Sequence, residues 1–191
     1  SVVNGSPDPI DADNRSTTKR AVCRESFVQR KMLLEVFSTE LCVNCAGAHV
    51  AIAEAMKDCD DYVELCHHAG FYTDGLTIDA SKDYEWFYKP SNLFAPALMA
   101  DRTNFGEEYP DYYNYGVPVI EGSGSRARLF HDVAMKIPAL VSVDMNVALD
   151  RETRMVSVNV KGNQLLPVEG ADMARLYVLL TEDSIFTTTQ R

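Results

Sequence analysis

Two cysteines separated by two residues are the feature of this sequence with the clearest chemical potential. They form the tetrapeptide Cys42-Val43-Asn44-Cys45, which lies between a short apolar run and an Ala-rich segment. At this spacing two thiols can approach within bonding distance across a single turn. At the start of a helix, backbone N–H groups and the helix dipole favour a thiolate and lower the thiol pKa from about 8.5. We therefore expect thiol–disulfide exchange, with Cys42 as the attacking thiol and Cys45 as the resolving thiol.

Two other uses of this pair stay open from the sequence. The first is a static disulfide that fixes the start of a helix. The second is a soft-metal site, because His49 follows Cys45 by four residues and can share its helix face. His67 and His68 end a predicted strand, where alternation sends their side chains to opposite sides of the sheet. One histidine together with the two thiols could hold Cu(I), although we expect no resident metal or cofactor and predict structural or solvated roles for these histidines.

The elements that must position the cysteines follow an alternating pattern. A buried strand over 31–38 precedes the pair, and an Ala- and Met-rich helix over 46–58 follows it, beginning around Val43. The later elements, in chain order, are a strand over 61–70, a helix over 81–89, a strand over 93–100 and a helix over 125–137. This order predicts an α/β sandwich of about 110 residues.

From residue 139 the apolar pattern changes to period two. It predicts three strands, VSVDMNVALD, RMVSVNVKG and ARLYVLLTED, with a hairpin through residues 150–153 between the first two. Since three strands cannot bury both of their faces, we expect part of an all-β, sandwich-like domain. We thus predict an extended N-terminal segment over 1–27, an α/β domain over 28–138 and a partial β domain over 139–191.

Composition restricts the class of protein. The chain has 191 residues with 18 Lys plus Arg against 28 Asp plus Glu, a formal net charge of −10. It has the balance of a soluble globular protein, and no stretch approaches the ~18 apolar residues of a membrane span. The acidic balance argues against nucleic acid and anionic bilayers as partners. The sequence begins at Ser1 without a basic-then-apolar leader, so we expect that any signal peptide has been removed.

Four segments together carry a resemblance to known proteins: LLEVFSTELCVNCAGAH, HHAGFYTD, LFAPALMADR and the later LLTED. The first three, with their strand–CxxC–helix order, resemble a thioredoxin-like fold. All four resemble the outer-membrane-protein-28-related family of Bacteroides-type bacteria over roughly residues 30–185. The resemblance implies an exported protein of the outer membrane, cell surface or periplasm, often made as a lipoprotein-type precursor.

The resemblance also implies roles for single residues. Pro96 would be the cis-proline that faces the cysteine pair, and Ala95 would offer backbone groups to a substrate strand. Glu35 would be either the buried proton acceptor near the pair or an ordinary acid near a strand edge. The chain departs from thioredoxin at Leu41, where Trp is usual, and at Val36, which stands where thioredoxin has its buried acid.

Several further residues have two readings. Cys59 and Cys66 could form a bridge, although we expect Cys66 to be a buried apolar thiol. Asp74 could bond a histidine near the site or stabilise its own turn. The partner of Cys23 is not indicated. Four tyrosines could form a recognition surface or pack on the core: Tyr109, Tyr112, Tyr113 and Tyr115.

The sequence therefore predicts an exported thioredoxin-like protein that exchanges disulfides with protein or peptide thiols. It would reach a membrane only through an anchor outside this sequence. A surface binding or structural module with a permanent disulfide is the alternative, and a copper-binding carrier is the third hypothesis.

Overall fold

The computed structural model describes residues 27–70, 72–89, 92–105, 117–167 and 175–185, together with two short N-terminal strands. These strands, β1 (Val2–Val3) and β2 (Ser6–Pro7), pair antiparallel within the segment predicted to be extended. Cys23 and the four tyrosines between 109 and 115 lie outside the described residues.

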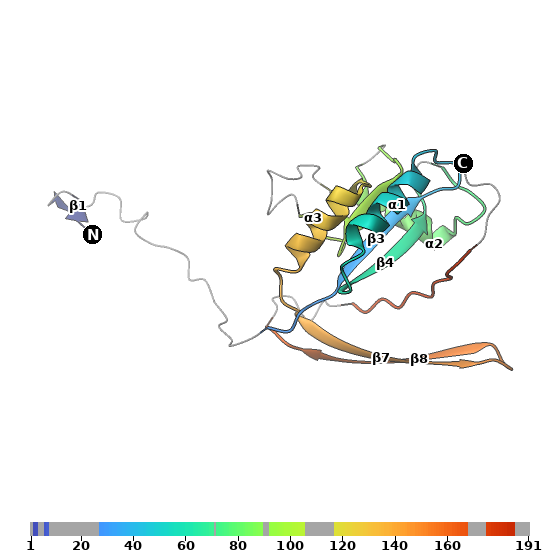
Figure 1. Ribbon diagram of the computed structural model, residues 1–191. Helices are drawn as coiled ribbons and strands as arrows, with labels where there is room; N and C mark the ends of the chain where they lie inside the picture. The colour runs from blue at the N-terminus through green and yellow to red at the C-terminus, as the bar shows by residue number, and fades with distance from the viewer. Residues whose placement is uncertain are drawn as a thin grey trace.

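A four-stranded mixed sheet forms the centre of the structure (Figure 1). Its strands lie in the order β4 (Tyr62–His68), β3 (Met32–Ser38), β5 (Ala97–Ala100) and β6 (Ile120–Glu121). β3 is parallel to β4 and antiparallel to β5, which in turn is antiparallel to β6. β3 is central and almost wholly buried, as expected for a continuous apolar run with both faces covered.

Two helices cover one face of this sheet. α1 (Cys45–Met56) and α3 (Gly124–Ala134) lie side by side across it (Figure 1). The buried residues of α1 are Cys45, Ile52 and Met56, a spacing that places them on one helix face. With Leu34 and Val36 of β3, the last two belong to the larger hydrophobic core cluster.

The other face of the sheet carries a short α2 (Asp79–Lys82) that continues as the 3₁₀ helix η1 (Asp83–Phe87). The sequence predicted one helix over 81–89 at this place. The aromatic residues of this segment pack inward: Tyr88 is buried, and Tyr84 and Phe87 lie against the second core cluster around Phe37. The sheet order and the helices on its two faces are those of a thioredoxin-like fold, so the predicted fold class is confirmed.

A long two-stranded ribbon follows the α/β domain. β7 (Val141–Asp150) and β8 (Met155–Gln164) pair antiparallel over ten residues each, which confirms two of the three predicted strands and their hairpin. The third predicted strand is wrong, because residues 175–183 form no ladder. An alternating apolar pattern is not sufficient for a strand, because a strand also needs a neighbouring strand with which to form hydrogen bonds. Tyr177 of this segment lies instead over the guanidinium of Arg102, 5.3 Å from ring centroid to Cζ.

No helix in the described part of the chain has the length and apolar character needed to cross a membrane.

Candidate redox site at the start of helix α1

The two cysteines of the CxxC sequence are joined in a disulfide, with their Cα atoms 5.4 Å apart. Cys42 is 3% exposed and Cys45 is fully buried. Helix α1 begins at Cys45 and not around Val43 as predicted, so Cys42 lies in the turn before the helix. There the Cys42 N–H donates to the Thr39 carbonyl (3.1 Å), and the Cys45 N–H donates to the Cys42 carbonyl (3.3 Å).

Two exposed apolar side chains form a rim beside Cys42. Leu41 is 39% exposed and Val43 is 75% exposed, on either side of Cys42. Asn44, the residue before the helix, is also exposed and makes no side-chain cap hydrogen bond. These two apolar side chains are therefore accessible to a molecule that approaches Cys42.

Pro96 lies across a shared cleft from the disulfide loop. The Ala95–Pro96 peptide bond is cis, as the resemblance implied. Asn44, Ala95 and Pro96 together line a cleft of about 520 Å³. The Pro96 carbonyl accepts a hydrogen bond from Gly122 N–H at 2.9 Å. The structure thus brings the cysteine loop, Ala95 and Pro96 to one cleft, while the contact of Ala95 with a substrate stays a prediction.

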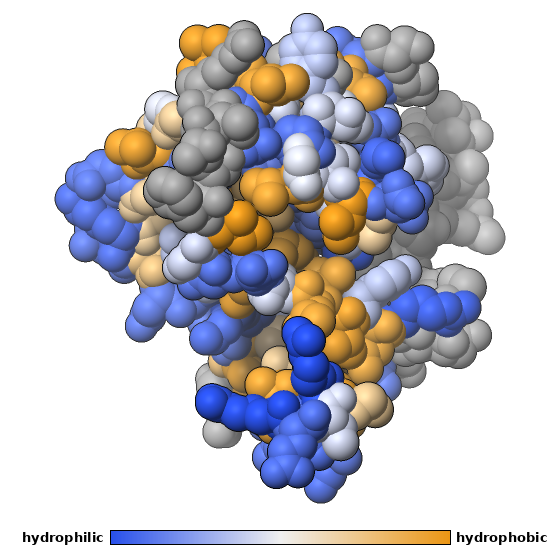
Figure 2. Space-filling view, turned by 90° about the vertical axis from the view of Figure 1, so that its right-hand side faces the viewer, coloured by the Kyte–Doolittle hydropathy of each residue, from blue (hydrophilic) through white to orange (hydrophobic). Residues whose placement is uncertain are grey.

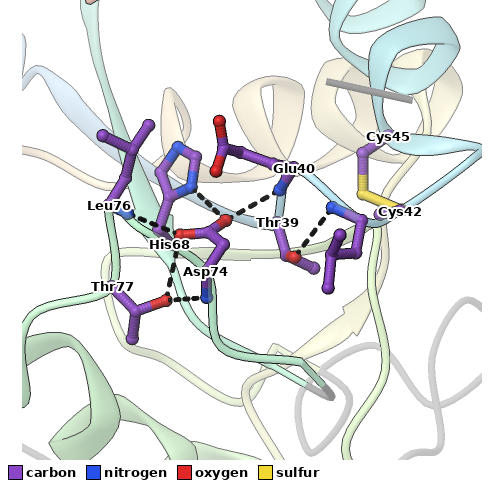
Figure 3. A network of polar contacts seen from close by, with 9 residues as sticks. Thr39, Glu40, Cys42, Cys45, His68, Asp74, Leu76 and Thr77 are labelled. Atoms are coloured by element: carbon purple, nitrogen blue, oxygen red, sulfur yellow. Dashed lines mark hydrogen bonds and ion pairs between the residues drawn. A yellow bond between two sulfur atoms is a disulfide. The ribbon is translucent and has the colours of Figure 1, made fainter. Parts of the chain in front are cut away.

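Asp74 connects a neighbouring loop to the residues just before Cys42 (Figure 3). Its Oδ2 accepts from the Glu40 N–H at 2.7 Å and lies 2.8 Å from His68 Nδ1. Its Oδ1 accepts from the N–H of Leu76 and the hydroxyl of Thr77. Both readings of Asp74 are therefore correct: it bonds a histidine and it stabilises its own turn.

The charge of Asp74 is held by these partners. Burial acts to raise the pKa of its carboxyl, but the His68 side chain and the N–H groups of Glu40 and Leu76 outweigh it and lower the pKa to about 2. The carboxylate is consequently ionised at neutral pH and anchors the loop that leads into the disulfide.

The three histidines considered as candidates for the site, His49, His67 and His68, occupy different environments. His67 and His68 lie on opposite faces of the sheet, as alternation predicted, since His67 stacks with Phe37 and His68 bonds Asp74. Burial, with a smaller contribution from His68, lowers the pKa of His49, which lies one helical turn after Cys45. Among the described residues, no cluster of three or more His, Cys, Asp or Glu side chains is placed to hold a metal ion.

Glu35 lies on the sheet face opposite helix α1. Its neighbours in β3, Leu34 and Val36, face the helices, whereas Glu35 pairs with Arg102 and His67. Arg102 donates from both Nε (3.0 Å) and Nη2 (2.8 Å) to the carboxylate, which is fully buried. Burial would raise the pKa of Glu35, but the hydrogen bonds with His67 and Arg102 outweigh it and lower the pKa.

Arg102 is the residue of this cluster that sequence reasoning did not single out. It also donates to the Tyr84 hydroxyl at 2.8 Å, which ties the 3₁₀ helix to the sheet. The segment LFAPALMADR contained it, but nothing in the spacing of Arg102 and Glu35 along the chain indicates their contact. The geometry assigns Glu35 to this ion pair, and its role as a proton acceptor for the cysteines stays a prediction without a contact to support it.

Cys59 and Cys66 are both free thiols. Cys66 is exposed, so the prediction of a buried thiol is wrong. The reason is that the faces of the sheet are covered less well at the edge strand β4, of whose seven residues only His67 is buried, than at the central strand β3. The surrounding protein nevertheless shields the thiol in part from water, and this desolvation raises the pKa of Cys66 to about 12. Cys66 therefore stays protonated at neutral pH.

No protein-family model matches the chain, and no curated protein matches it by sequence. Two solved structures are similar to it in shape. HBP35 of Porphyromonas gingivalis aligns with a TM-score of 0.50 and 15% identity, over 72% of this chain and 43% of HBP35. A protein from Agrobacterium tumefaciens aligns with a TM-score of 0.45 and 18% identity, over 64% of this chain and 54% of its own length. In both cases the match spans less than two thirds of the neighbour, and the likeness to HBP35 supports the fold alone.

Proposed function

We propose that this protein exchanges disulfides with protein or peptide thiols through Cys42 and Cys45. The observation that carries the proposal is the Cys42–Cys45 disulfide before α1, whose loop residue Asn44 lines one cleft with the cis-proline Pro96. The cleft supplies room for an extended segment of a partner, and the apolar rim of Leu41 and Val43 supplies contact area beside the sulfurs.

The exchange balances as two displacements at sulfur. In the reduced protein, the Cys42 thiolate attacks a partner disulfide, which forms a mixed disulfide and releases one partner thiolate. The Cys45 thiolate then attacks Cys42 Sγ, which re-forms the Cys42–Cys45 bond and releases the second partner thiolate. Two electrons pass from the protein to its partner, and the reverse sequence oxidises a partner dithiol. The start of α1 favours Cys42 as a thiolate because the positive end of the helix dipole lies there.

We further propose that this chemistry takes place outside the cytoplasm, in the cell envelope or at the cell surface. The support is the resemblance of the CxxC, HHAGFYTD and LFAPALMADR segments to an exported bacterial family. Fractionation of the native organism, with detection by antibody, tests this placement.

Trapping the mixed disulfide tests the mechanism. In a reduced Cys45→Ser variant, Cys42 attacks glutathione disulfide and stays glutathionylated, because no resolving thiol remains. Peptide mass spectrometry of samples taken over time at neutral pH identifies the glutathionylated residue and measures the rate of its modification. We expect Cys42 to react at least about tenfold faster than Cys66, whose raised pKa keeps it protonated. Equal or slower reaction at Cys42 would contradict the proposal.

A permanent structural disulfide in a binding module is the second candidate, and one observation favours it. Both sulfurs are almost completely buried, which protects the bond from attack. The same experiment separates the two functions. A structural pair resists mild reduction in the wild-type protein and gives no fast-reacting Cys42 in the variant.

A further inference from the structure

One face of the ribbon of β7 and β8 is formed by apolar side chains, Gly162 and, at the end away from the turn, the uncharged Gln164 opposite Val141. Alternation along each strand and the register between them place the apolar residues on this side: Val141, Val143, Met145, Val147, Leu149, Val156, Val158 and Val160. We call these eight residues the apolar face. Met145 lies opposite Val160 and Val147 opposite Val158, so the middle of the face is aliphatic in both strands.

The opposite side of the ribbon is suited to water. Ser142, Asp144 and Asn146 of β7 lie opposite Asn163, Lys161 and Asn159 of β8. The charged residues of the turn, Asp150 to Arg154, lie beyond the end of the apolar face. No charged side chain belongs to the apolar face, so covering it would leave no unpaired charge buried.

The apolar face is open in the described structure. Val143 is 55% exposed, Met145 62% and Val147 54%, values far from those of a sheet packed on a core. The ribbon lies below the α/β domain in Figure 1, and Figure 2 shows hydrophobic residues at the surface at the same height. An isolated two-stranded ribbon is at best marginally stable in water, and it gains stability when a second layer covers its apolar side.

We propose that the apolar face packs against the same face of a second copy of this chain. The contact is isologous: two ribbons lie face to face about 10 Å apart and form a four-stranded sandwich around a two-fold axis. The apolar face can pack against a copy of itself because it carries no charge along its length. The charged residues next to it lie at the turn, at one end of the ribbon. Each copy has one such face, so the assembly closes at two.

The area is sufficient for a specific dimer. Seven of the eight side chains are 39–62% exposed and Val160 is less so. If each removes on the order of 60 Å² from water, each copy contributes about 500 Å². Two copies then bury about 1,000 Å² or somewhat more with the ribbon edges, which is the lower end of the range of specific interfaces. The interface is therefore expected to be reversible and dependent on protein concentration.

The test compares two lysine substitutions that differ only in the face they occupy. Val147→Lys places a charge in the middle of the apolar face. Asn146→Lys places the same charge on the polar face, at the neighbouring position in β7. Size-exclusion chromatography with light scattering is run on the full chain from about 1 to about 100 µM. A reducing buffer prevents interchain disulfides through Cys59 or Cys66.

We expect the wild type and Asn146→Lys to reach twice the chain mass of 21.3 kDa as concentration rises. Val147→Lys raises the dimer dissociation constant by at least about 100-fold, because it buries an unpaired charge. Near-UV circular dichroism, unchanged in both variants, shows that the α/β domain keeps its fold.

Three outcomes overturn the proposal. The first is a wild-type protein that stays monomeric at the highest concentration. If the monomeric Val147→Lys variant then also unfolds at a lower temperature than the wild type, the chain itself covers the apolar face. A dimer that both variants retain places the interface elsewhere. A continuous series of larger species shows an open contact and not a closed pair. None of these results bears on the chemistry of Cys42, which is tested separately.

Discussion

Asp74 is the residue whose charge fixes the approach to the disulfide. It holds the Glu40 N–H, two residues before Cys42, and bonds His68 from the edge strand. One carboxylate therefore joins the loop after β3 to the end of β4 and the turn that follows it. The position of Cys42, the proposed attacking thiol, therefore depends on this loop.

Replacement of Asp74 by Asn removes the charge that His68 and the backbone N–H groups stabilise. We expect a loss of about 1–3 kcal/mol in the free energy of unfolding at neutral pH, measured by urea denaturation. The matched control is Asp79→Asn, whose carboxylate is 99% exposed beside Lys82, and which should change stability by less than about 0.5 kcal/mol.

The same variant has a defined pH dependence. The pKa of Asp74 is lowered from 3.8 to about 2 in the folded protein, so its charge stabilises the fold above about pH 4. This contribution is lost as pH falls from about 4 through 2, where the folded protein also takes up the proton. The difference in stability between wild type and Asp74→Asn should therefore shrink across that window. A difference that stays constant from pH 7 to pH 2 would contradict the assignment.

The buried ion pair of Glu35 and Arg102 is a second residue-scale feature with a measurable consequence. Arg102→Met leaves the fully buried Glu35 with His67 as its remaining side-chain partner, and we expect a loss of about 3–5 kcal/mol. Arg128→Met is the control, because Arg128 and Asp132 form an exposed pair on α3 worth less than about 0.5 kcal/mol. Equal midpoints in thermal denaturation of the two variants would exclude a stabilising role for Arg102.

At the scale of elements, the close contact between α1 and α3 fixes the helix that carries Cys45. Gly124, the first residue of α3, lies against α1: a Cβ there would meet the backbone of Ala51 and lie 3.1 Å from the Cβ of Ala55. Only a residue without a side chain allows this approach.

Gly124→Ala should therefore destabilise the protein by about 1–3 kcal/mol, because α3 must move away from α1. Gly47→Ala is the matched control in the other helix. A Cβ at Gly47 meets nothing within 4 Å, so this substitution should stabilise by about 0.5–1 kcal/mol through helix propensity. Thermal denaturation of both variants checks the opposite signs, and a neutral or stabilising Gly124→Ala would contradict the packing argument.

Elements were predicted correctly from sequence where a periodic pattern extends over many residues. The prediction failed where the presence of a strand depends on its pairing with another strand. The strands β3 and β4 and the helices α1 and α3 lie within a few residues of their predicted bounds. The two-residue β6 was missed, since it is defined by its ladder with β5 and not by its own pattern. Residues 175–183 are the opposite case: they have an apolar pattern typical of a strand but pair with no strand in the described part of the chain.

At the scale of the whole molecule, the order of elements was enough to predict the fold, and the spacing of the CxxC pair was enough to predict that Cys42 and Cys45 can bond across one turn. The cis peptide at Pro96 followed from family resemblance and is present. The contacts of Glu35 with Arg102 could not be predicted, because the two residues are 67 positions apart and meet only through the antiparallel register of β3 and β5. The hydrogen bond between the Glu40 N–H and Asp74 was hidden because these residues are 34 positions apart, in the segments that follow the parallel strands β3 and β4.

The molecule thus combines a thioredoxin-like domain that holds a disulfide with a ribbon that exposes an apolar face. The first feature carries the proposed exchange chemistry, and the second carries the proposed contact between two copies. Both proposals depend on surfaces of the folded protein, and the sequence alone describes these surfaces only as patterns of residue type.

The reduction potential of the Cys42–Cys45 pair tests the central claim most directly. It is measured by equilibrating the full chain in a series of thiol/disulfide buffers, followed by alkylation and mass spectrometry of the peptide that contains both cysteines. We predict a value between about −120 and −270 mV, the range of proteins that exchange disulfides with partners. A value below about −300 mV would contradict the account and identify a permanent structural disulfide.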